Sequence, residues 1–183
     1  MPIQTPICDF GQIAHDFKLK STDNKILSLD DIKGENGTLI MFICNHCPYV
    51  KAVTKDIVED CNKLKKIGIN SVAICANDAE NYPEDSFENM IIFAKKNQFS
   101  FPYLNDETQE IAKTYDAVCT PDFFGYNKDL ELQYRGRLRE LKNLVPVREG
   151  ESDLFKAMKQ ISETSKGPEN QTPSAGCSIK WKQ

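Results

Sequence analysis

The sequence predicts one α/β domain with a mixed sheet flanked by helices, and three observations carry this prediction. Residues 38–43 (TLIMFI) are an apolar run of strand length. Residues 48–66 repeat apolar positions at helical spacing. Between them stands Cys-Asn-His-Cys, at residues 44–47, followed at once by a proline. A CxxC pair at a strand-to-helix junction in a βαβ context indicates thiol–disulfide chemistry.

The composition bounds the class of protein. With 183 residues and 40% hydrophobic residues, the chain is long enough for one domain with a substantial core. A net charge of −4 with interspersed acidic and basic residues gives no basic stripe, which argues against nucleic acid as a partner. No apolar run reaches the ~18 residues of a membrane helix, and the first ten residues lack the pattern of a signal peptide. We therefore expect a cytoplasmic protein without a membrane partner.

The seven cysteines form an odd set without the dense spacing of a secreted disulfide scaffold. Most should be free thiols in a reducing compartment. A structural zinc site usually needs two CxxC pairs, or one pair with two spaced histidines, and only one CxxC is present. The expected metal content is none. The cysteines stand at positions 8, 44, 47, 61, 75, 119 and 177.

The first half of the chain reads as a hairpin over 17–29, the strand at 38–43, the helix over 48–66 and a buried strand over 69–75. The helix should end at Gly68. One apolar stripe of the helix contains Cys61, which we interpret as a small core residue. Cys75, at the carboxyl end of the second strand, could approach the site, but we favour a buried inert thiol.

Residues 76–105 read as an insertion that shapes the rim of the site, with a polar loop, a helix around 87–94 and an aromatic stretch. Asp106 and Gln109 suggest a capping box that opens a short helix. A hairpin over 122–135 and a helix around 154–161 close the domain. The order βαβ then ββα is the thioredoxin arrangement, extended by the N-terminal hairpin and the insertion.

We divide the chain into a thioredoxin-like domain, residues 1–165, and a C-terminal tail, residues 166–183. The tail begins rich in Gly, Pro and Ser, as a linker does. Its end, with Cys177, Ile179 and the only tryptophan, Trp181, suggests that it docks on the same domain.

Several segments together resemble the peroxiredoxin-like thioredoxin-family proteins of the alkyl hydroperoxide reductase/thiol-specific antioxidant (AhpC/TSA) superfamily. The resemblance covers nearly the whole chain. It rests on FICNHCPYV at 42–50, Asn77-Asp78, YPED at 82–85, CTPDFF at 119–124, YRGR at 134–137 and GCSIKW at 176–181.

The resemblance implies that Cys44 and Cys47 form the redox pair and that Pro121 is a cis-proline facing it. In this fold such a proline exposes the backbone of Thr120, on which an extended substrate segment could pair as an added strand. Cys47 takes the place of the peroxidatic cysteine of true peroxiredoxins. The peroxiredoxin signature Pro-x-x-x-Thr-x-x-Cys is absent, because Ile40 and Cys44 stand where proline and threonine belong.

The motif itself predicts roles. In a CxxC at a helix start, the first cysteine is expected at the exposed end as the nucleophile with the lowest thiol pKa, and the second as the resolving thiol. This assigns the attack to Cys44 and the resolution to Cys47. His46 can stabilise the Cys44 thiolate, although a solvated histidine at a helix start is the alternative. Thioredoxins carry a buried acid six positions before the first cysteine. Here that position is Thr38, so another base or water must serve.

The favoured function is a thiol–disulfide oxidoreductase that uses Cys44 and Cys47 without a bound cofactor. Its expected partners are a disulfide-bearing protein or a small-molecule thiol or disulfide, and a reductase or thiol donor. A thiol-dependent peroxidase is the alternative, and a module that binds Cu(I) or zinc through Cys44, Cys47 and Cys177 is a further one. Cys119 and Cys177 are candidates for a third redox cysteine, Cys177 by exchange with Cys44.

Overall fold

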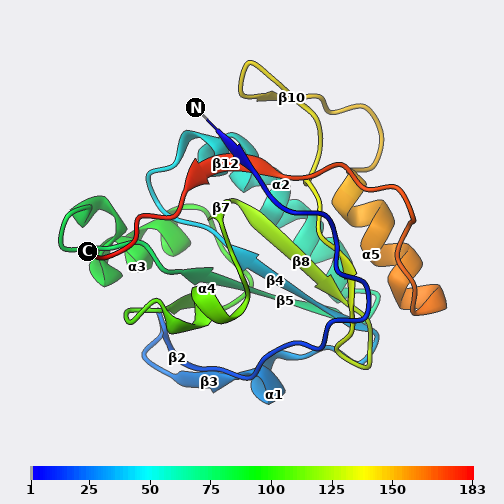
Figure 1. Ribbon diagram of the computed structural model, residues 1–183, viewed down its shortest axis with the longest axis horizontal. Coiled ribbons are helices and arrows are strands. Elements are labelled where there is room, and N and C mark those ends of the chain that lie inside the picture. The colour runs from blue at the N-terminus through cyan, green and yellow to red at the C-terminus, as the bar shows by residue number, and fades with distance from the viewer. Residues whose placement is uncertain (1) are drawn as a thin grey trace.

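A seven-stranded mixed sheet forms the centre of the computed structural model, which describes residues 2–183 (Figure 1). The parallel pairs are β4 with β5 and β5 with β6, and the other neighbours are antiparallel. The strands, in their order across the sheet, are β3 (Ile26–Ser28), β2 (Lys18–Ser21), β6 (Tyr103–Asn105), β5 (Ile69–Cys75), β4 (Gly37–Phe42), β8 (Asp122–Tyr126) and β9 (Leu132–Tyr134).

Two apolar layers cover the sheet, and β4 contributes to both because successive side chains of a strand point to opposite faces. Leu39 and Met41 pack in one layer with α2 (Pro48–Lys65), α3 (Phe87–Lys96) and α5 (Asp153–Thr164). Ile40 and Phe42 pack in the other with α1 (Leu29–Ile32) and α4 (Glu110–Thr114). All residues of β4 are buried, so the strand that leads into the CxxC motif is the rigid centre of the molecule.

Helix α2 begins where the sequence predicted. Cys47 is its N-cap residue and Pro48 its first residue, a position that suits proline because no N–H is needed there. The predicted stripe is buried, including Cys61. The chain leaves the helix through Gly68, whose φ of +82° is one that glycine adopts without strain.

The expected hairpins β2–β3 and β8–β9 are present, as are β5, α3 and α5, but the proposed capping box was wrong. Gln109 has a φ of +67°, and its side chain donates to the carbonyls of Ala76 and Lys180 instead. The carboxylate of Asp106 still accepts the N–H of Ala112 at 2.8 Å. The helix therefore begins at Glu110.

The C-terminal tail lies across the domain beside the start of α2, where β12 (Ala175–Ser178) is drawn in red (Figure 1). It forms the middle of a three-stranded sheet between β1 (Ile3–Gln4) and β7 (Cys119–Thr120). Ile179 is buried in the second apolar layer. Trp181 is 38% exposed and lies under the ammonium of Lys113 at 5.6 Å, so Ile179 is the apolar anchor.

A short hairpin of β10 (Leu141–Lys142) and β11 (Val145–Pro146) projects from the body. Among residues 2–183, no helix is both long and apolar enough to cross a membrane.

Candidate active site at the start of helix α2

The CxxC motif occupies the turn between β4 and α2, and both of its thiols are buried. Cys44 is 1% exposed and Cys47 is 0% exposed. All seven cysteines of the chain are free. The expectation that Cys44 lies at the exposed end was therefore wrong. The physical reason is that segments distant in sequence cover the turn: Thr120, the tail strand β12 and the insertion around Asp85.

Thr120 contacts both thiols. Its Oγ1 lies 3.5 Å from Cys44 Sγ, and its backbone oxygen lies 3.4 Å from Cys47 Sγ. The peptide bond between Thr120 and Pro121 is cis, as the resemblance implied. Asp122 holds this loop, because its carboxylate accepts the N–H of Val118 at 3.2 Å and pairs with the buried guanidinium of Arg135 at 2.9 Å.

The backbone of Thr120 is not open to an added strand. β12 already pairs with it, with Cys177 opposite Thr120 and Ser178 opposite Cys119. Gly176 allows this close approach, since a Cβ at that position would lie only 2.0 Å from the Thr120 oxygen. The edge that we assigned to a substrate segment is occupied by the chain's own tail.

The surroundings favour the thiolate on Cys47 rather than on Cys44. Hydrogen bonds from the thiols of Cys44 and Cys177 and from the backbone of Val50, at the start of α2, lower the pKa of Cys47. Donation to Cys47, burial and the nearby Asp85 carboxylate raise the pKa of Cys44. The prediction that Cys44 has the lowest thiol pKa does not match this environment, because Cys47, not Cys44, caps the helix.

Asp85 is the residue that the sequence reasoning missed. It ends the short 3-10 helix η1 (Pro83–Asp85) in the insertion, and its side chain is fully buried. One oxygen accepts the backbone N–H of Asn45 at 2.7 Å, and the other accepts from Asn77 at 2.9 Å. That second oxygen also lies 2.6 Å from His46 Nδ1, a close polar contact without the alignment of a good hydrogen bond.

His46 thus lies between a buried carboxylate and a thiol. One ring nitrogen, Cys44 Sγ and a carboxylate oxygen of Asp85 all lie within 4.8 Å of one another. The ring stacks on Tyr82 at 6.1 Å and keeps about a quarter of its side chain exposed. The three groups could serve as ligands of a metal ion. They also have the composition of a thiol beside an acid-oriented imidazole.

Four of the other five cysteines separate into a buried group and a half-buried one. Cys61 and Cys75 are fully buried, and burial raises the pKa of each to about 12. Burial also raises the pKa of Cys119, whose thiol lies 3.7 Å from the Pro121 oxygen. Cys177 is half-buried and stands opposite Thr120, whose backbone oxygen contacts Cys47 Sγ. Its predicted exchange with Cys44 stays a prediction.

The thiols named in the soft-metal hypothesis lie in one apolar layer, which contains Cys44 and Cys47 and against which Cys177 packs. That hypothesis stays a prediction. Metal analysis of protein purified under reducing conditions tests it.

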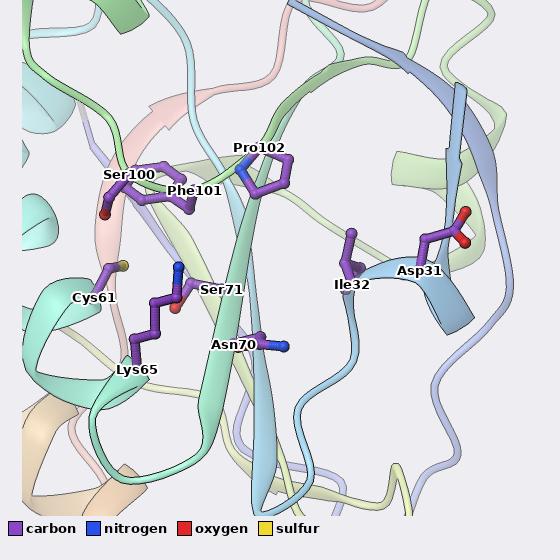
Figure 2. Close-up of a pocket in the computed structure, with 9 residues that line it drawn as sticks. All are labelled: Asp31, Ile32, Cys61, Lys65, Asn70, Ser71, Ser100, Phe101 and Pro102. Carbon is purple, nitrogen blue, oxygen red and sulfur yellow. The ribbon is translucent and has the colours of Figure 1, made fainter. Parts of the chain in front are cut away.

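The cavities lie beside the thiols rather than over them. Figure 2 shows one cavity at the far end of α2, which Cys61 and Lys65 line from the helix and Phe101 from the opposite loop. Another, of about 240 Å³, lies next to Pro121 between Tyr49, Arg137 and the tail at Ala175. The second adjoins the motif, because Tyr49 and Pro121 line it.

Comparison with known proteins places this geometry in a family. The model of the AhpC/TSA family matches residues 10–140. The chain is 29% identical over 115 residues to peroxiredoxin Q, chloroplastic, of Populus jackii, which covers 63% of this chain. It spans about half the length, 49%, of that curated relative.

Solved structures agree with the fold. An uncharacterized conserved protein from Geobacillus kaustophilus is 43% identical, with a TM-score of 0.91 over 100% of this chain and 97% of the other. A thiol:disulfide interchange protein of the thioredoxin family from Chlorobium tepidum TLS is 16% identical, with a TM-score of 0.64 over 83% of this chain and 97% of the other. This second likeness supports the thioredoxin fold alone.

The family match spans well over half of the chain, and the matched region contains the cysteine pair, the cis-proline loop and the central sheet. The chain is therefore a peroxiredoxin-like, thioredoxin-fold member of the AhpC/TSA family.

Proposed function

We propose that the protein is a thiol–disulfide oxidoreductase whose Cys44 and Cys47 cycle between the dithiol and the disulfide. The observation that carries the proposal is that both thiols lie against one residue, Thr120, at the start of α2 beside the cis-proline: Cys44 Sγ is 3.5 Å from Thr120 Oγ1 and Cys47 Sγ is 3.4 Å from the Thr120 oxygen. Two neighbouring thiols at a helix N-terminus can share one negative charge and can close a disulfide.

The pair supplies its own base. At rest the Cys44 thiol donates to the Cys47 thiolate. Cys44 passes its proton to Cys47 and attacks one sulfur of a substrate disulfide. The substrate S–S bond breaks, and one substrate thiolate leaves and takes the proton from Cys47. Cys47 then attacks Cys44 Sγ, which closes the Cys44–Cys47 disulfide and releases the second substrate thiolate. This use of Cys47 fills the role left open by Thr38.

His46 and Asp85 bear on the first step. An imidazole within 4.8 Å of Cys44 Sγ can stabilise the negative charge that develops there, as a cation or as a neutral N–H donor. The Asp85 carboxylate alone would oppose that charge, and its contact with His46 Nδ1 at 2.6 Å offsets this effect. Asp85 is a positioning residue, because it acts through the imidazole.

The partners follow from the shape of the site. A small disulfide, or a flexible protein segment, would enter beside the partly exposed His46 and Tyr82. A longer strand would have to displace β12 from Thr120 before it could pair there. A thiol donor or reductase would regenerate the dithiol.

A disulfide-reduction assay with dithiothreitol as the electron donor tests the proposal. Wild type should accelerate reduction of insulin or a small aromatic disulfide, whereas Cys44→Ser and Cys47→Ser should fall to the uncatalysed rate. Cys61→Ala is the matched control, because it removes a buried thiol from the same helix away from the motif. Equal activity in wild type and Cys44→Ser would refute the proposal.

A thiol-dependent peroxidase is the second candidate, and one observation favours it: the stabilised thiolate is on Cys47, in the place of a peroxidatic cysteine. The replacement of the signature proline and threonine by Ile40 and Cys44 argues against fast turnover. Stopped-flow measurement of hydroperoxide consumption separates the two. We expect hydroperoxide consumption to be slower than disulfide reduction. Hydroperoxide consumption faster than disulfide reduction would favour the peroxidase function.

A further inference from the structure

The tail strand β12 sits where a substrate strand would sit. It pairs antiparallel with β7 at the edge beside the cis-proline, with Cys177 directly opposite Thr120. Ser174 fixes the entry to this strand by donating to the Pro121 oxygen at 2.7 Å, and Gly176 lets the backbones approach. Beyond the strand, the backbone N–H of Lys180 donates to Asn77 at 2.9 Å. The position of Cys177 is therefore set by bonds on both sides.

The register of β12 brings Cys177 to Cys47. Its strand partner, Thr120, has its backbone oxygen 3.4 Å from Cys47 Sγ, and Cys177 packs against the apolar layer that contains Cys47. Cys44 Sγ lies against the Thr120 side chain, 3.5 Å from Oγ1. Cys47 thus lies between two thiols, one three residues before it and one brought by the tail.

We propose that Cys177 is a third exchanging thiol, which attacks Cys47 of the Cys44–Cys47 disulfide and moves the disulfide to Cys47–Cys177. The Cys47–Cys177 bond forms as the Cys44–Cys47 bond breaks. Cys44 leaves as a thiolate, and the proton of Cys177 passes to Cys44 or to water. The number of disulfides is unchanged, so the step needs no further oxidant.

The electrostatics favour this step after oxidation. Burial, a hydrogen bond to Cys47 and the charge of Cys47 raise the pKa of Cys177 to about 11 in the reduced protein. Once Cys47 is in a disulfide, its charge is lost and the last two of these causes disappear. Cys177 then becomes easier to deprotonate when Cys47 becomes open to attack.

The product would differ in function from the Cys44–Cys47 disulfide. It fastens β12 covalently over the Thr120 edge and returns Cys44 as a free nucleophile beside His46. The inference rests on the proposed function, because the first disulfide comes from exchange at Cys44 and Cys47.

Disulfide mapping tests the inference on the full chain. Reduced wild type, Cys44→Ser and Cys177→Ser are equilibrated in glutathione buffers, quenched in acid, alkylated and mapped without reduction. Wild type should contain both Cys44–Cys47 and Cys47–Cys177 peptides. Cys177→Ser should contain Cys44–Cys47 alone. In Cys44→Ser, Cys47 should attack oxidised glutathione, and Cys177 should displace the glutathione to leave Cys47–Cys177.

The expected magnitude follows from proximity. Two thiols in contact have an effective concentration of millimolar or more, so in Cys44→Ser the internal disulfide should exceed the glutathione adduct on Cys47 at ~1 mM glutathione. Cys8→Ser is the matched control, because Cys8 is also half-buried with its pKa raised to about 11, but does not contact the motif. Its disulfide map should equal that of wild type.

The outcomes separate the two proposals. If wild type forms Cys44–Cys47 but no Cys47–Cys177 in any of the buffers, the third-thiol inference is wrong and the exchange function stands. If wild type forms no Cys44–Cys47 disulfide in any glutathione buffer, the proposed function fails first. Wild type alone suffices for this decision, so the result does not depend on whether Cys44→Ser folds.

Discussion

Cys44 and Cys47 are the same residue type three positions apart, yet their surroundings separate their protonation states. Cys47 gains donors from the helix start and from two thiols, while Cys44 faces burial and the Asp85 carboxylate. Because the two thiols share a proton, protonation of one changes the pKa of the other. Reactivity at the motif therefore depends on residues from η1, β7 and β12 as much as on the four motif residues.

The hydrogen bond between the thiols can be tested with two substitutions at one position. Cys44→Ala removes the donor and should raise the pKa of the thiolate on Cys47, whereas Cys44→Ser keeps a hydroxyl donor and should raise it less. The measurement is the ultraviolet absorbance of the thiolate against pH in reduced protein. Cys47→Ser should abolish the low-pH transition, and a transition that survives in it would show that Cys44 holds the charge.

His46 and Asp85 should shift the redox potential in opposite directions. His46→Ala removes the imidazole beside the cysteine pair and leaves the Asp85 carboxylate unbalanced, which disfavours the negative charge of the reduced pair, so the disulfide should become less oxidising. Asp85→Asn removes a negative charge near Cys44, so the disulfide should become more oxidising. Each shift should be on the order of 30 mV, which corresponds to roughly 1.4 kcal/mol for a two-electron couple.

Equilibration with glutathione at fixed pH measures both potentials. Tyr82→Phe is the control, since it keeps the ring that stacks on His46 and removes no charge. Redox potentials that move in the same direction in the two variants would contradict the electrostatic account. An unchanged potential in His46→Ala would mean that His46 is a solvated side chain without effect on the cysteine pair.

At the scale of elements, β12 is a strand because of what it meets rather than what it contains. Its residues, Ala175–Ser178, have little intrinsic strand propensity. The edge of β7 offers unpaired backbone groups, and β1 closes the other side. Gly176 is the contact that makes the fit possible, since any side chain there meets the Thr120 oxygen.

Gly176→Ala should therefore dislodge the tail strand. Its Cβ would meet backbone at 2.0 Å, which a small rotamer change cannot relieve. Overpacking of this kind typically costs about 1–3 kcal/mol. Denaturant unfolding should show this loss, and hydrogen exchange should show faster exchange at β12 and β7. Ser178→Ala is the control on the same strand, because Ser178 is exposed. Equal protection in both variants would mean that β12 does not depend on the close approach.

The elements that the sequence predicted well are those with a strong period. The apolar stripe of α2, the continuous apolar run of β4 and the alternating hairpins are each long enough for the hydrophobic pattern to distinguish helix from strand. Neither the segment around Asp85 nor β12 has such a hydrophobic pattern. Asp85 reaches the motif across 40 positions of sequence through an insertion without a period, and β12 is a strand only in the presence of β7. The exposure of Cys44 was wrong for the same reason, since its cover comes from these two segments.

At the scale of the whole molecule, the lowered pKa of Cys47 couples the redox site to folding stability. The folded state holds the Cys47 thiolate at pH values where the unfolded chain, with an ordinary thiol pKa of about 8.5, still binds the proton. Between these two values the unfolded state binds more protons, so stability rises with pH. It is lost again as pH falls through the folded pKa of Cys47.

The reduced protein should therefore gain stability relative to Cys47→Ser as pH rises from below neutral toward about 8.5, by up to about 1.4 kcal/mol per pH unit. Above that range the raised pKa of Cys44 acts in the opposite direction, because the unfolded chain then releases a proton that folded Cys44 retains. Urea unfolding at a series of pH values, in reducing buffer, measures the difference in unfolding free energy between the two proteins. Carboxylates and histidines contribute almost equally to both proteins, so their effect largely drops out of this difference.

The oxidised protein is the control. In the Cys44–Cys47 disulfide neither sulfur titrates, so oxidised wild type should lack the pH-dependent gain in stability. A reduced wild type whose advantage over Cys47→Ser does not change with pH would show that the folded state does not hold a thiolate at Cys47.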